Sequence, residues 1–363
     1  MRYLDPMRVI RPRTSVMASV AAAGLLAFAP PALAEDSVTS YPHFSGELSF
    51  EVEDDWTVDS DDAAAEINDI FATVELAAAL NFTEAFSLNG TFLFEPVLDP
   101  IDDREFEDHG FFVEEIYLRY DADVAAVFLG KFNPTFGTAW DITPGIYGAD
   151  FAEDYELAEK IGGGIEIPFN AGGSEHTVTF NAFFADTTFL SESAGENRGR
   201  TRKSDGGASN TEDPASFSLT LDGAIPGTEA NYHLGGRFQS GGDGDPGDDI
   251  GFVAGVNKEW DLGGDTALMA LAEFAYIDEQ DGGLADAFYS TAGASYTWSQ
   301  WSASASYSFR EIDDGLDADH LVQASLGYEF EIGLGVEVGY RFGQEGEVDS
   351  HTLGALLSYG VSF

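Results

Sequence analysis

Residues 301–310 read WSASASYSFR, and their alternation is the strongest indication of the architecture. Up to Phe309 the odd positions are tryptophan, alanine, tyrosine and phenylalanine, whereas the even positions are serine until Arg310. Successive side chains of a β-strand point to opposite faces, so one face of this segment is apolar and the other is polar. Residues 353–363 alternate in the same way and end in phenylalanine. Both segments predict strands whose two faces meet different environments.

The same alternation recurs along the chain, separated by breaks rich in glycine and aspartate. It predicts about 16 strands, most of them long enough to cross a bilayer when tilted and longer than the strands of soluble β-sandwiches. The breaks between them are alternately short and long, as in outer-membrane barrels. The predicted strands are 43–58, 66–82, 84–97, 111–121, 123–132, 159–169, 175–189, 214–223, 229–239, 249–261, 266–278, 286–298, 301–311, 319–330, 334–343 and 349–363.

Aromatic residues gather near the ends of these strands, in two sets. Such sets are typical of the two interfacial girdles of a membrane barrel. The sequence therefore predicts an all-β protein, a closed transmembrane antiparallel β-barrel with short periplasmic turns and long extracellular loops. One set is Phe82, Tyr120, Phe169, Trp260, Trp298, Trp301 and Phe330, and the other is Trp56, Phe94, Phe111, Tyr276 and Phe288.

The composition excludes several classes of protein. The chain of 363 residues has 16 basic and 65 acidic residues, a formal net charge of −49, so it lacks the basic surface that nucleic acids require. It contains no cysteine, which excludes disulfide scaffolds, thiolate metal sites and cysteine nucleophiles. With 44% hydrophobic and 13% aromatic residues, it is also too apolar for a disordered acidic chain.

Residues 1–34 have the layout of a secretory signal peptide. Four arginines precede an apolar stretch, 16–29, which is short for a membrane-spanning helix, and Ala32-Leu33-Ala34 supplies a small-x-small cleavage site. The alternative is an N-terminal membrane anchor. We expect removal of 1–34 and export of a single barrel domain, 35–363, which is still more acidic than the whole chain.

Two stretches resemble sixteen-stranded bacterial porins of the general-diffusion type. The alternating C-terminal segment 353–363, which ends in Phe363, resembles the assembly signal of outer-membrane barrels. Residues 130–137, GKFNPTFG, resemble the junction that in porins precedes a long third loop folded into the pore. The resemblance implies a homotrimer in the outer membrane of a Gram-negative cell. Its partners would be outer-membrane lipid, lipopolysaccharide and, through the last strand, the barrel-assembly machinery.

The long break 133–158 follows the fifth predicted strand, where a third loop should begin. Acids early in its second half, then Lys160 and the glycines 162–164, predict a short helix. We expect this constriction loop to lie inside the barrel and to narrow the pore, although an acidic loop in external water is the alternative. Its candidate pore-facing acids are Asp141, Asp150, Glu153, Asp154 and Glu156.

Porins of this class set basic side chains on the wall across from the acidic third loop, and the resemblance carries this arrangement to the inward positions here. Such a pair of clusters would create a transverse field in the pore. The large excess of acids favours cations over anions as the preferred ions. The alternative is a set of scattered rim charges without an organised field. The candidate basic residues are Lys131, Arg237, Arg310, Arg341 and, further along the wall, Arg119.

An acidic, glycine-rich loop offers a candidate Ca²⁺ site, because carboxylates on glycine turns suit cations that prefer oxygen ligands. It lacks the glutamate that closes an EF-hand loop, and its acids could instead share divalent ions with lipopolysaccharide phosphates. No other cofactor is expected. The candidate ligands are Asp243, Asp245, Asp248 and Asp249.

These observations predict a porin, a water-filled channel for passive diffusion of small hydrophilic solutes and ions, and not an enzyme. The alternatives are a porin selective for a particular ion, sugar or metal chelate, and a barrel that hydrolyses lipid or peptide bonds. A hydrolase needs a histidine near a nucleophile and an acid, yet the histidines are scattered over separate strands and loops. They are His43, His109, His176, His233, His320 and His351.

Overall fold

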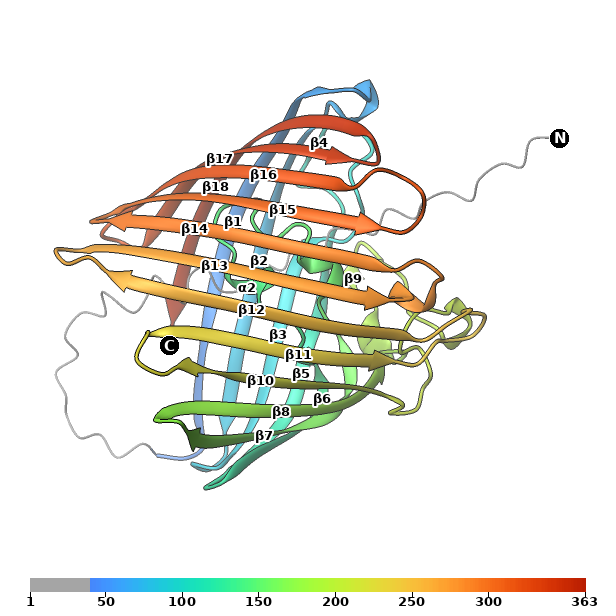
Figure 1. Ribbon diagram of the computed structural model, residues 1–363, viewed down its shortest axis with the longest axis vertical. Helices are drawn as coiled ribbons and strands as arrows, with labels where there is room; N and C mark the ends of the chain where they lie inside the picture. The colour runs from blue at the N-terminus through green and yellow to red at the C-terminus, as the bar shows by residue number, and fades with distance from the viewer. Residues whose placement is uncertain (1–39) are drawn as a thin grey trace.

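The computed structural model describes residues 40–363, which form one closed β-barrel (Figure 1). The expected signal peptide, 1–34, lies outside the described residues. Within residues 40–363 no helix has the length and apolar character needed to cross a membrane.

Sixteen long antiparallel strands of the described chain build the barrel wall, as the alternation predicts. Most observed bounds agree with the predicted ones to within a few residues. The long strands are β1 (His43–Ser60), β2 (Asn68–Asn81), β3 (Phe86–Pro96), β5 (His109–Ala122), β6 (Ala125–Phe132), β7 (Lys160–Ala171), β8 (Ser174–Ala185), β10 (Ser216–Ile225), β11 (Ala230–Gln239), β12 (Asp249–Asp261), β13 (Thr266–Asp278), β14 (Ala287–Trp298), β15 (Trp301–Ile312), β16 (Asp319–Glu329), β17 (Leu334–Glu345) and β18 (Val348–Ser362).

The sheet closes where the last strand meets the first. Strand β18 pairs with β1 from Glu47 opposite Ser362 to Ser60 opposite Ser350. Gly46 and Phe363 then exchange two backbone hydrogen bonds of 3.0 Å beyond the end of that ladder. Closure leaves no long strand within residues 40–363 with an unpaired edge, which is a requirement for β-structure in lipid.

Two additional two-residue strands belong to loops at one end of the barrel. Strand β4 (Arg104–Glu105) runs parallel to the start of β2, at Asp69 and Ile70. The Arg104 guanidinium is 2.5 Å from the Asp69 carboxylate. Strand β9 (Ala194–Gly195) pairs with the start of β5, so the loop between β8 and β10 reaches back across the strands in between. These contacts fold both loops onto the barrel.

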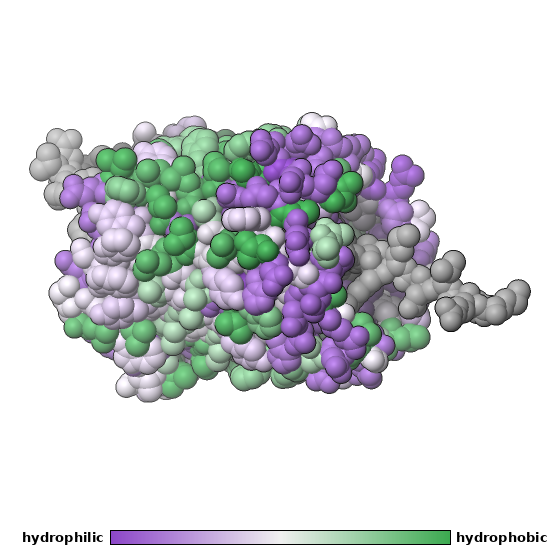
Figure 2. Space-filling model, turned by 90° about the horizontal axis from the view of Figure 1, so that it is seen from above, coloured by the Kyte–Doolittle hydropathy of each residue, from purple (hydrophilic) through white to green (hydrophobic). Residues whose placement is uncertain are grey.

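Short turns join the strands at one end and longer loops join most of them at the other. Turns such as 172–173 and 299–300 contain only two residues, whereas residues 133–159 and 186–215 form the two longest connections. Figure 2 shows hydrophilic residues gathered toward one end of the molecule and a paler, more apolar surface over the rest. The connection 346–347 is also only two residues, shorter than the expected break 344–348.

The two faces of the wall follow the predicted parity over most strands. In β15, Trp301 and Tyr307 are exposed on the outside, whereas Ser306 and Ser308 are buried on the inside. The predicted girdle residues lie at strand ends, and Trp298, Trp301 and Tyr328 form a continuous aromatic contact at the short-turn end. An apolar outer face is what a barrel needs in contact with lipid.

Helical structure is confined to short segments, and the predicted helix in the second half of 133–158 is wrong. That region contains one 3-10 turn, η3, and Glu159 has a positive φ of 56°. A four-residue helix, α2, lies earlier in the loop. The helical segments of the described chain are α2 (Ala139–Ile142), η2 (Ala63–Ala65), η3 (Glu153–Tyr155), η4 (Phe189–Ser191), η5 (Lys203–Asp205) and η6 (Gln280–Gly282).

Candidate pore constriction

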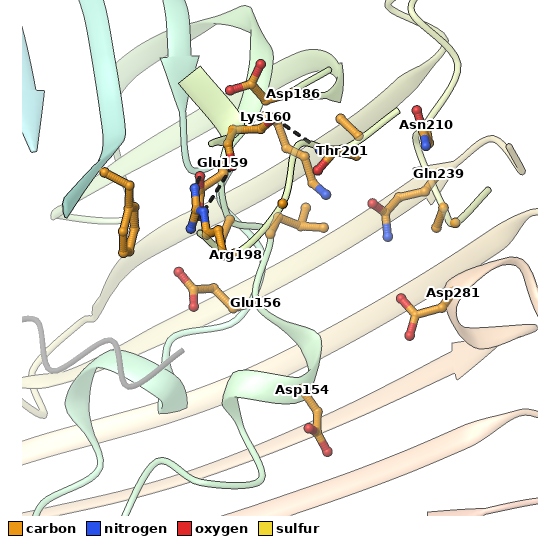
Figure 3. A pocket seen from close by; sticks show the side chains of 18 of the residues that line it. Asp154, Glu156, Glu159, Lys160, Asp186, Arg198, Thr201, Asn210, Gln239 and Asp281 are labelled. Atoms are coloured by element: carbon orange, nitrogen blue, oxygen red, sulfur yellow. Dashed lines mark hydrogen bonds and ion pairs between the residues drawn. The ribbon is translucent and has the colours of Figure 1, made fainter. Parts of the chain in front are cut away.

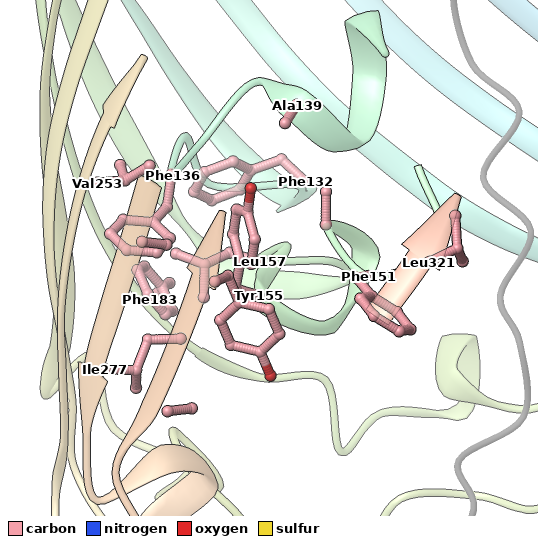
Figure 4. Close-up of a cluster of buried hydrophobic side chains, with 14 residues drawn as sticks. Phe132, Phe136, Ala139, Phe151, Tyr155, Leu157, Phe183, Val253, Ile277 and Leu321 are labelled. Carbon is pink, nitrogen blue, oxygen red and sulfur yellow. The ribbon is translucent and has the colours of Figure 1, made fainter. Parts of the chain in front are cut away.

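Residues 133–159, the inner loop, lie inside the barrel. Figure 4 shows the loop side chains Phe136, Tyr155 and Leu157 grouped beside Val253 and Ile277 of the wall. These side chains belong to one buried apolar cluster. Burial of apolar surface therefore holds the loop against β12 and β13, away from the water beyond the barrel mouth.

One buried carboxylate fixes the first half of the inner loop. Glu273 of β13 accepts hydrogen bonds from the Thr138 hydroxyl (2.9 Å), from the backbone N–H groups of Thr138 (2.8 Å) and Ala139 (3.0 Å), and from the Tyr155 hydroxyl (2.7 Å). The last donor comes from the second half of the loop, so Glu273 ties both halves to one strand. Hydrogen bonds to a charged acceptor are among the stronger ones in proteins.

Further polar contacts carry the loop across the barrel. Gln323 of β16 donates to the Pro144 carbonyl at 2.7 Å, and Ser325 accepts from the Ile146 N–H at 3.3 Å. On the far side, the Tyr147 hydroxyl donates to Asp55 of β1 at 2.5 Å. The loop thus reaches from β6 to β1 and narrows the lumen, as the sequence predicts.

A bulge in β5 positions the start of the inner loop. The pairing of β5 with β3 shifts by one residue between Val113 and Glu115. The Asn133 side chain donates to Glu114 and its backbone N–H donates to Glu115, both at 2.9 Å. Strict alternation along 111–121 places only one of these two neighbouring glutamates, Glu115, toward the lumen and so misses Glu114. The glutamate doublet, which interrupts the alternation, was the available signal.

Three predicted arginines contact the inner loop instead of facing it across a gap, which corrects the expected arrangement. Arg310 lies 2.7 Å from Asp154, and Arg341 lies 2.9 Å from Asp150. Arg237 donates to the Tyr155 carbonyl at 2.8 Å and pairs with Asp249 through two bonds of 2.8 Å. The loop lies against these arginines because two of its acids and one of its carbonyl groups are their partners.

The other two predicted bases do not line the constriction. The Lys131 side chain is completely buried, 2.6 Å from Glu159 and 3.0 Å from Asp186, under the loop that β9 holds down. Gly130, with a φ of 153°, interrupts the alternation just before it. Arg119 lies near the short-turn end of β5 and pairs with Glu166 at 2.6 Å. The Lys131 prediction as a pore-wall residue is therefore wrong.

Carboxylates face the inner loop from the strands that it does not cover. The strongest charged neighbours of Glu51 and Glu75 are carboxylates, among them Glu115 and Asp141. Glu156 of the loop joins this group, and burial together with Glu114, Asp141, Glu115 and Glu159 raises its pKa to about 8. The remaining predicted acid, Glu153, begins the turn η3 and is half-buried. Asp141 and Glu156 therefore lie near acids of the wall, whereas Asp150 and Asp154 form ion pairs with arginines.

The four candidate Ca²⁺ ligands do not converge. Asp249 is paired with Arg237, and Asp248 accepts the Gly241 N–H at 2.8 Å. Asp245 accepts the N–H groups of Gly207 (2.9 Å) and Gly242 (2.8 Å). Across residues 40–363, no three histidine, aspartate or glutamate side chains are grouped so that they could hold a metal ion. Asp245 and Asp248 thus organise loops by hydrogen bonding.

One histidine has the acid partner that a catalytic dyad would have. His233 Nδ1 lies 2.6 Å from Asp222. Its Nε2, where a nucleophile would stand, accepts the backbone N–H of Gly137 at 3.2 Å. The pair therefore serves as another anchor of the inner loop.

A cavity of about 460 Å³ opens beside the inner loop, on the side of the long connections. Figure 3 shows Glu156 on one side of it and Asn210, Gln239 and Asp281 on the other. Arg198 closes part of its wall with two bonds to Glu159, at 2.7 and 2.5 Å.

Comparisons with known proteins agree with this architecture. A family model described as Gram-negative porin matches residues 18–362. Among solved structures, OprB of Pseudomonas putida is similar with a TM-score of 0.63 at 10% identity, over 88% of this chain and 94% of that one. The channel DcaP of Acinetobacter baumannii gives 0.54 at 10% identity, over 88% and 96%. OmpT of Vibrio cholerae, in a trimer form, gives 0.50 at 14% identity, over 88% and 98%. No curated protein sequence matches the chain.

Proposed function

The chain belongs to the Gram-negative porin family and forms an outer-membrane channel, and we propose that this channel passes small hydrophilic solutes by diffusion with a preference for cations. The barrel supplies the conduit and the inner loop supplies its narrowest part. Selectivity in such a pore depends on which charges remain unpaired along the path.

The pairing of the arginines is the observation that supports cation preference. Arg237, Arg310 and Arg341 each contact a carboxylate, so their positive charges are largely balanced where the loop lies. Across the remaining opening, Glu51 and Glu75 have other carboxylates as their strongest charged neighbours. A path bordered by acids on both sides concentrates cations and repels anions.

Planar-bilayer recording tests this proposal. We expect a stepwise conductance and, under a KCl gradient, a reversal potential of the sign that cation preference requires. Changing Glu51, Glu75 and Glu115 together to glutamine should remove most of that preference. The matched control changes three exposed acids near the short-turn end, Glu175, Glu229 and Glu331, and should leave the reversal potential unchanged. A folded barrel without conductance, or a wild-type preference for chloride, would refute the proposal.

We also propose that the protein is exported, loses its signal peptide and assembles as a homotrimer. The barrel-assembly machinery would recognise its last strand, and lipopolysaccharide would surround its long loops. The trimer form described for OmpT of Vibrio cholerae supports the oligomeric state by analogy of fold. Native mass spectrometry of the detergent-extracted protein should give three times the mass of the processed chain. A monomer would contradict the proposed trimer and would leave the proposed channel function untouched.

The family membership favours a channel over a hydrolase, and the engagement of His233 with the Gly137 N–H agrees with that. Selectivity for one class of solute is the remaining alternative. The lining of the cavity beside the inner loop favours one such class.

A further inference from the structure

The cavity beside the inner loop contains two buried acceptors that lack donors. Glu95, at the end of β3, is 1% exposed, and its Oε2 has no hydrogen-bond partner within residues 40–363. Asn210 is 2% exposed, and its Oδ1 likewise has none in that range. The amide of Asn210 is oriented by its own donations to the carbonyls of Arg202 (2.7 Å) and Gly206 (2.9 Å). Both residues line the cavity.

Buried acceptors of this kind are costly unless a donor reaches them. Leaving a buried polar group unsatisfied costs about 1–3 kcal/mol, and more when the group is charged. Native proteins pair nearly all such groups, and the exceptions often mark sites that another molecule completes. A ligand for this cavity should therefore bring hydrogen-bond donors.

The arginines at the cavity are already engaged and do not offer a site for an anion. The Nε atom of Arg198 donates to the Ser191 carbonyl at 3.0 Å, and its two terminal nitrogens donate to Glu159. Its guanidinium also lies 3.9 Å from the centre of the Phe112 ring. Arg237 is committed in the same way to Asp249 and to the Tyr155 carbonyl. With Lys160, three bases line the cavity against six acids, so the acids outnumber the cations there.

Part of the remaining lining is apolar. Val97, Phe112 and Leu157 contribute carbon surface between the polar groups. Metal ions would need several converging oxygen ligands, and residues 40–363 contain no such group. A pocket of this size, in which apolar patches lie between polar groups, is suited to a small organic molecule that has both an apolar part and polar ends.

We propose that this cavity binds small organic cations, with an ammonium group donating to Glu95 and a second polar end reaching Asn210. The inference rests on the channel function proposed above and names a class of solute for it. Linear alkyl diamines fit this description, because an apolar chain joins two donors. Bound in front of the constriction, such a solute is held at the entrance and then passes a path bordered by acids.

Isothermal titration calorimetry of the purified barrel in detergent tests the site without requiring conduction. Cadaverine is the probe, and 1,5-pentanediol and glutarate are its neutral and anionic counterparts of equal chain length. We expect saturable binding of cadaverine alone. The variant Glu95→Gln should weaken binding about tenfold or more, since it removes the charge from a hydrogen bond to an ammonium group. Glu47→Gln removes a lumen carboxylate outside the cavity and should leave the affinity unchanged.

Three results would overturn the inference. Equal binding of pentanediol would mean that charge does not matter, and displacement of cadaverine by millimolar Mg²⁺ would mean an unspecific acidic surface. Unchanged affinity in Glu95→Gln would place the ligand elsewhere. The comparison of the three probes uses only the wild-type protein and so does not depend on folding of the variant. A conducting, cation-preferring channel that fails these tests loses the diamine site but keeps the proposed function, whereas loss of conductance refutes the function alone.

Discussion

Glu273 illustrates how much of the pore depends on single side chains. It stands on the wall at β13, yet four donors from both halves of the inner loop reach it. Its inward position follows from the alternation, but its partners do not, because alternation gives the face of a strand and not what crosses the lumen. The sequence therefore predicts where this carboxylate points without predicting that it is an anchor.

We predict that Glu273→Gln loosens the inner loop. Glutamine carries an amide donor where Glu273 accepts, so at least one loop donor loses its partner and a charged hydrogen bond becomes a neutral one. Hydrogen exchange over 133–159 should speed up about tenfold, and open-channel current noise should increase. Tyr155→Phe removes only one of the donors and should give a smaller change. Unaltered exchange in both variants would show that the apolar cluster alone holds the loop.

The constriction should also respond to pH through Glu156. Burial first, and then Glu114, Asp141, Glu115 and Glu159, raise its pKa to about 8, while Asn133 lies within 3.5 Å of its carboxylate. The side chain is mostly neutral at pH 7 and charged at pH 9. Cation preference measured by reversal potential should therefore increase as the pH rises from 7 to 9, and Glu156→Gln should show a smaller increase. The same pH response in the variant would assign it to another group.

At the scale of elements, the strands are predictable and the inner loop is not. Strand bounds follow from a period of two, which is local information. The helix expected in the second half of the loop fails because its acids have partners outside the loop: Asp150 pairs with Arg341 and Asp154 with Arg310. The long-range ion pairs, together with the positive φ of Glu159, favour an irregular course over a helix. No local pattern contains those partners.

The bulge in β5 should stabilise the barrel through its contacts with Asn133. Asn133→Ala removes the amide that donates to Glu114 and that accepts the Glu159 N–H at 2.7 Å, and so disconnects both ends of the inner loop. The free energy of unfolding in urea should fall by about 1–3 kcal/mol, because a buried glutamate loses its donor. Asn89→Ala, which loses only a bond to Ser87 on the same face of the same strand, is the control. Equal effects of the two changes would remove the special role of the bulge.

For the whole molecule, the number of strands and the closed barrel follow from the sequence, but the positions of side chains around the circumference do not. Alternation places Arg237, Arg310 and Arg341 inside correctly. It cannot give the strand tilt and stagger that bring them onto one side of the lumen, where the loop neutralises them. The prediction of Lys131 as a pore-wall residue is wrong for a related reason, because a loop from a distant part of the chain covers its side chain.

Closure of the barrel carries the last prediction. Phe363 bonds to Gly46 through its backbone, and its ring lies 5.3 Å from that of Phe44. Phe363→Ala should reduce the amount of folded protein in the outer membrane several-fold, measured by the heat-dependent shift of the barrel on gels. Val361→Ala, also on the outer face of β18, should have little effect. Normal levels of the folded Phe363→Ala variant would show that assembly does not depend on this contact at the closure of the barrel.

The inner loop also has a mechanical consequence. A ring of strands is stiff along its hydrogen bonds but easily flattened across its diameter, as any thin hoop is. Hydrogen bonds join the inner loop to Asp55, Glu273 and Gln323, so the loop connects three separate points of the wall across the lumen. Lateral pressure from the bilayer then meets resistance in the plane of the membrane. The aperture should consequently keep its cross-section when the lipid around it changes.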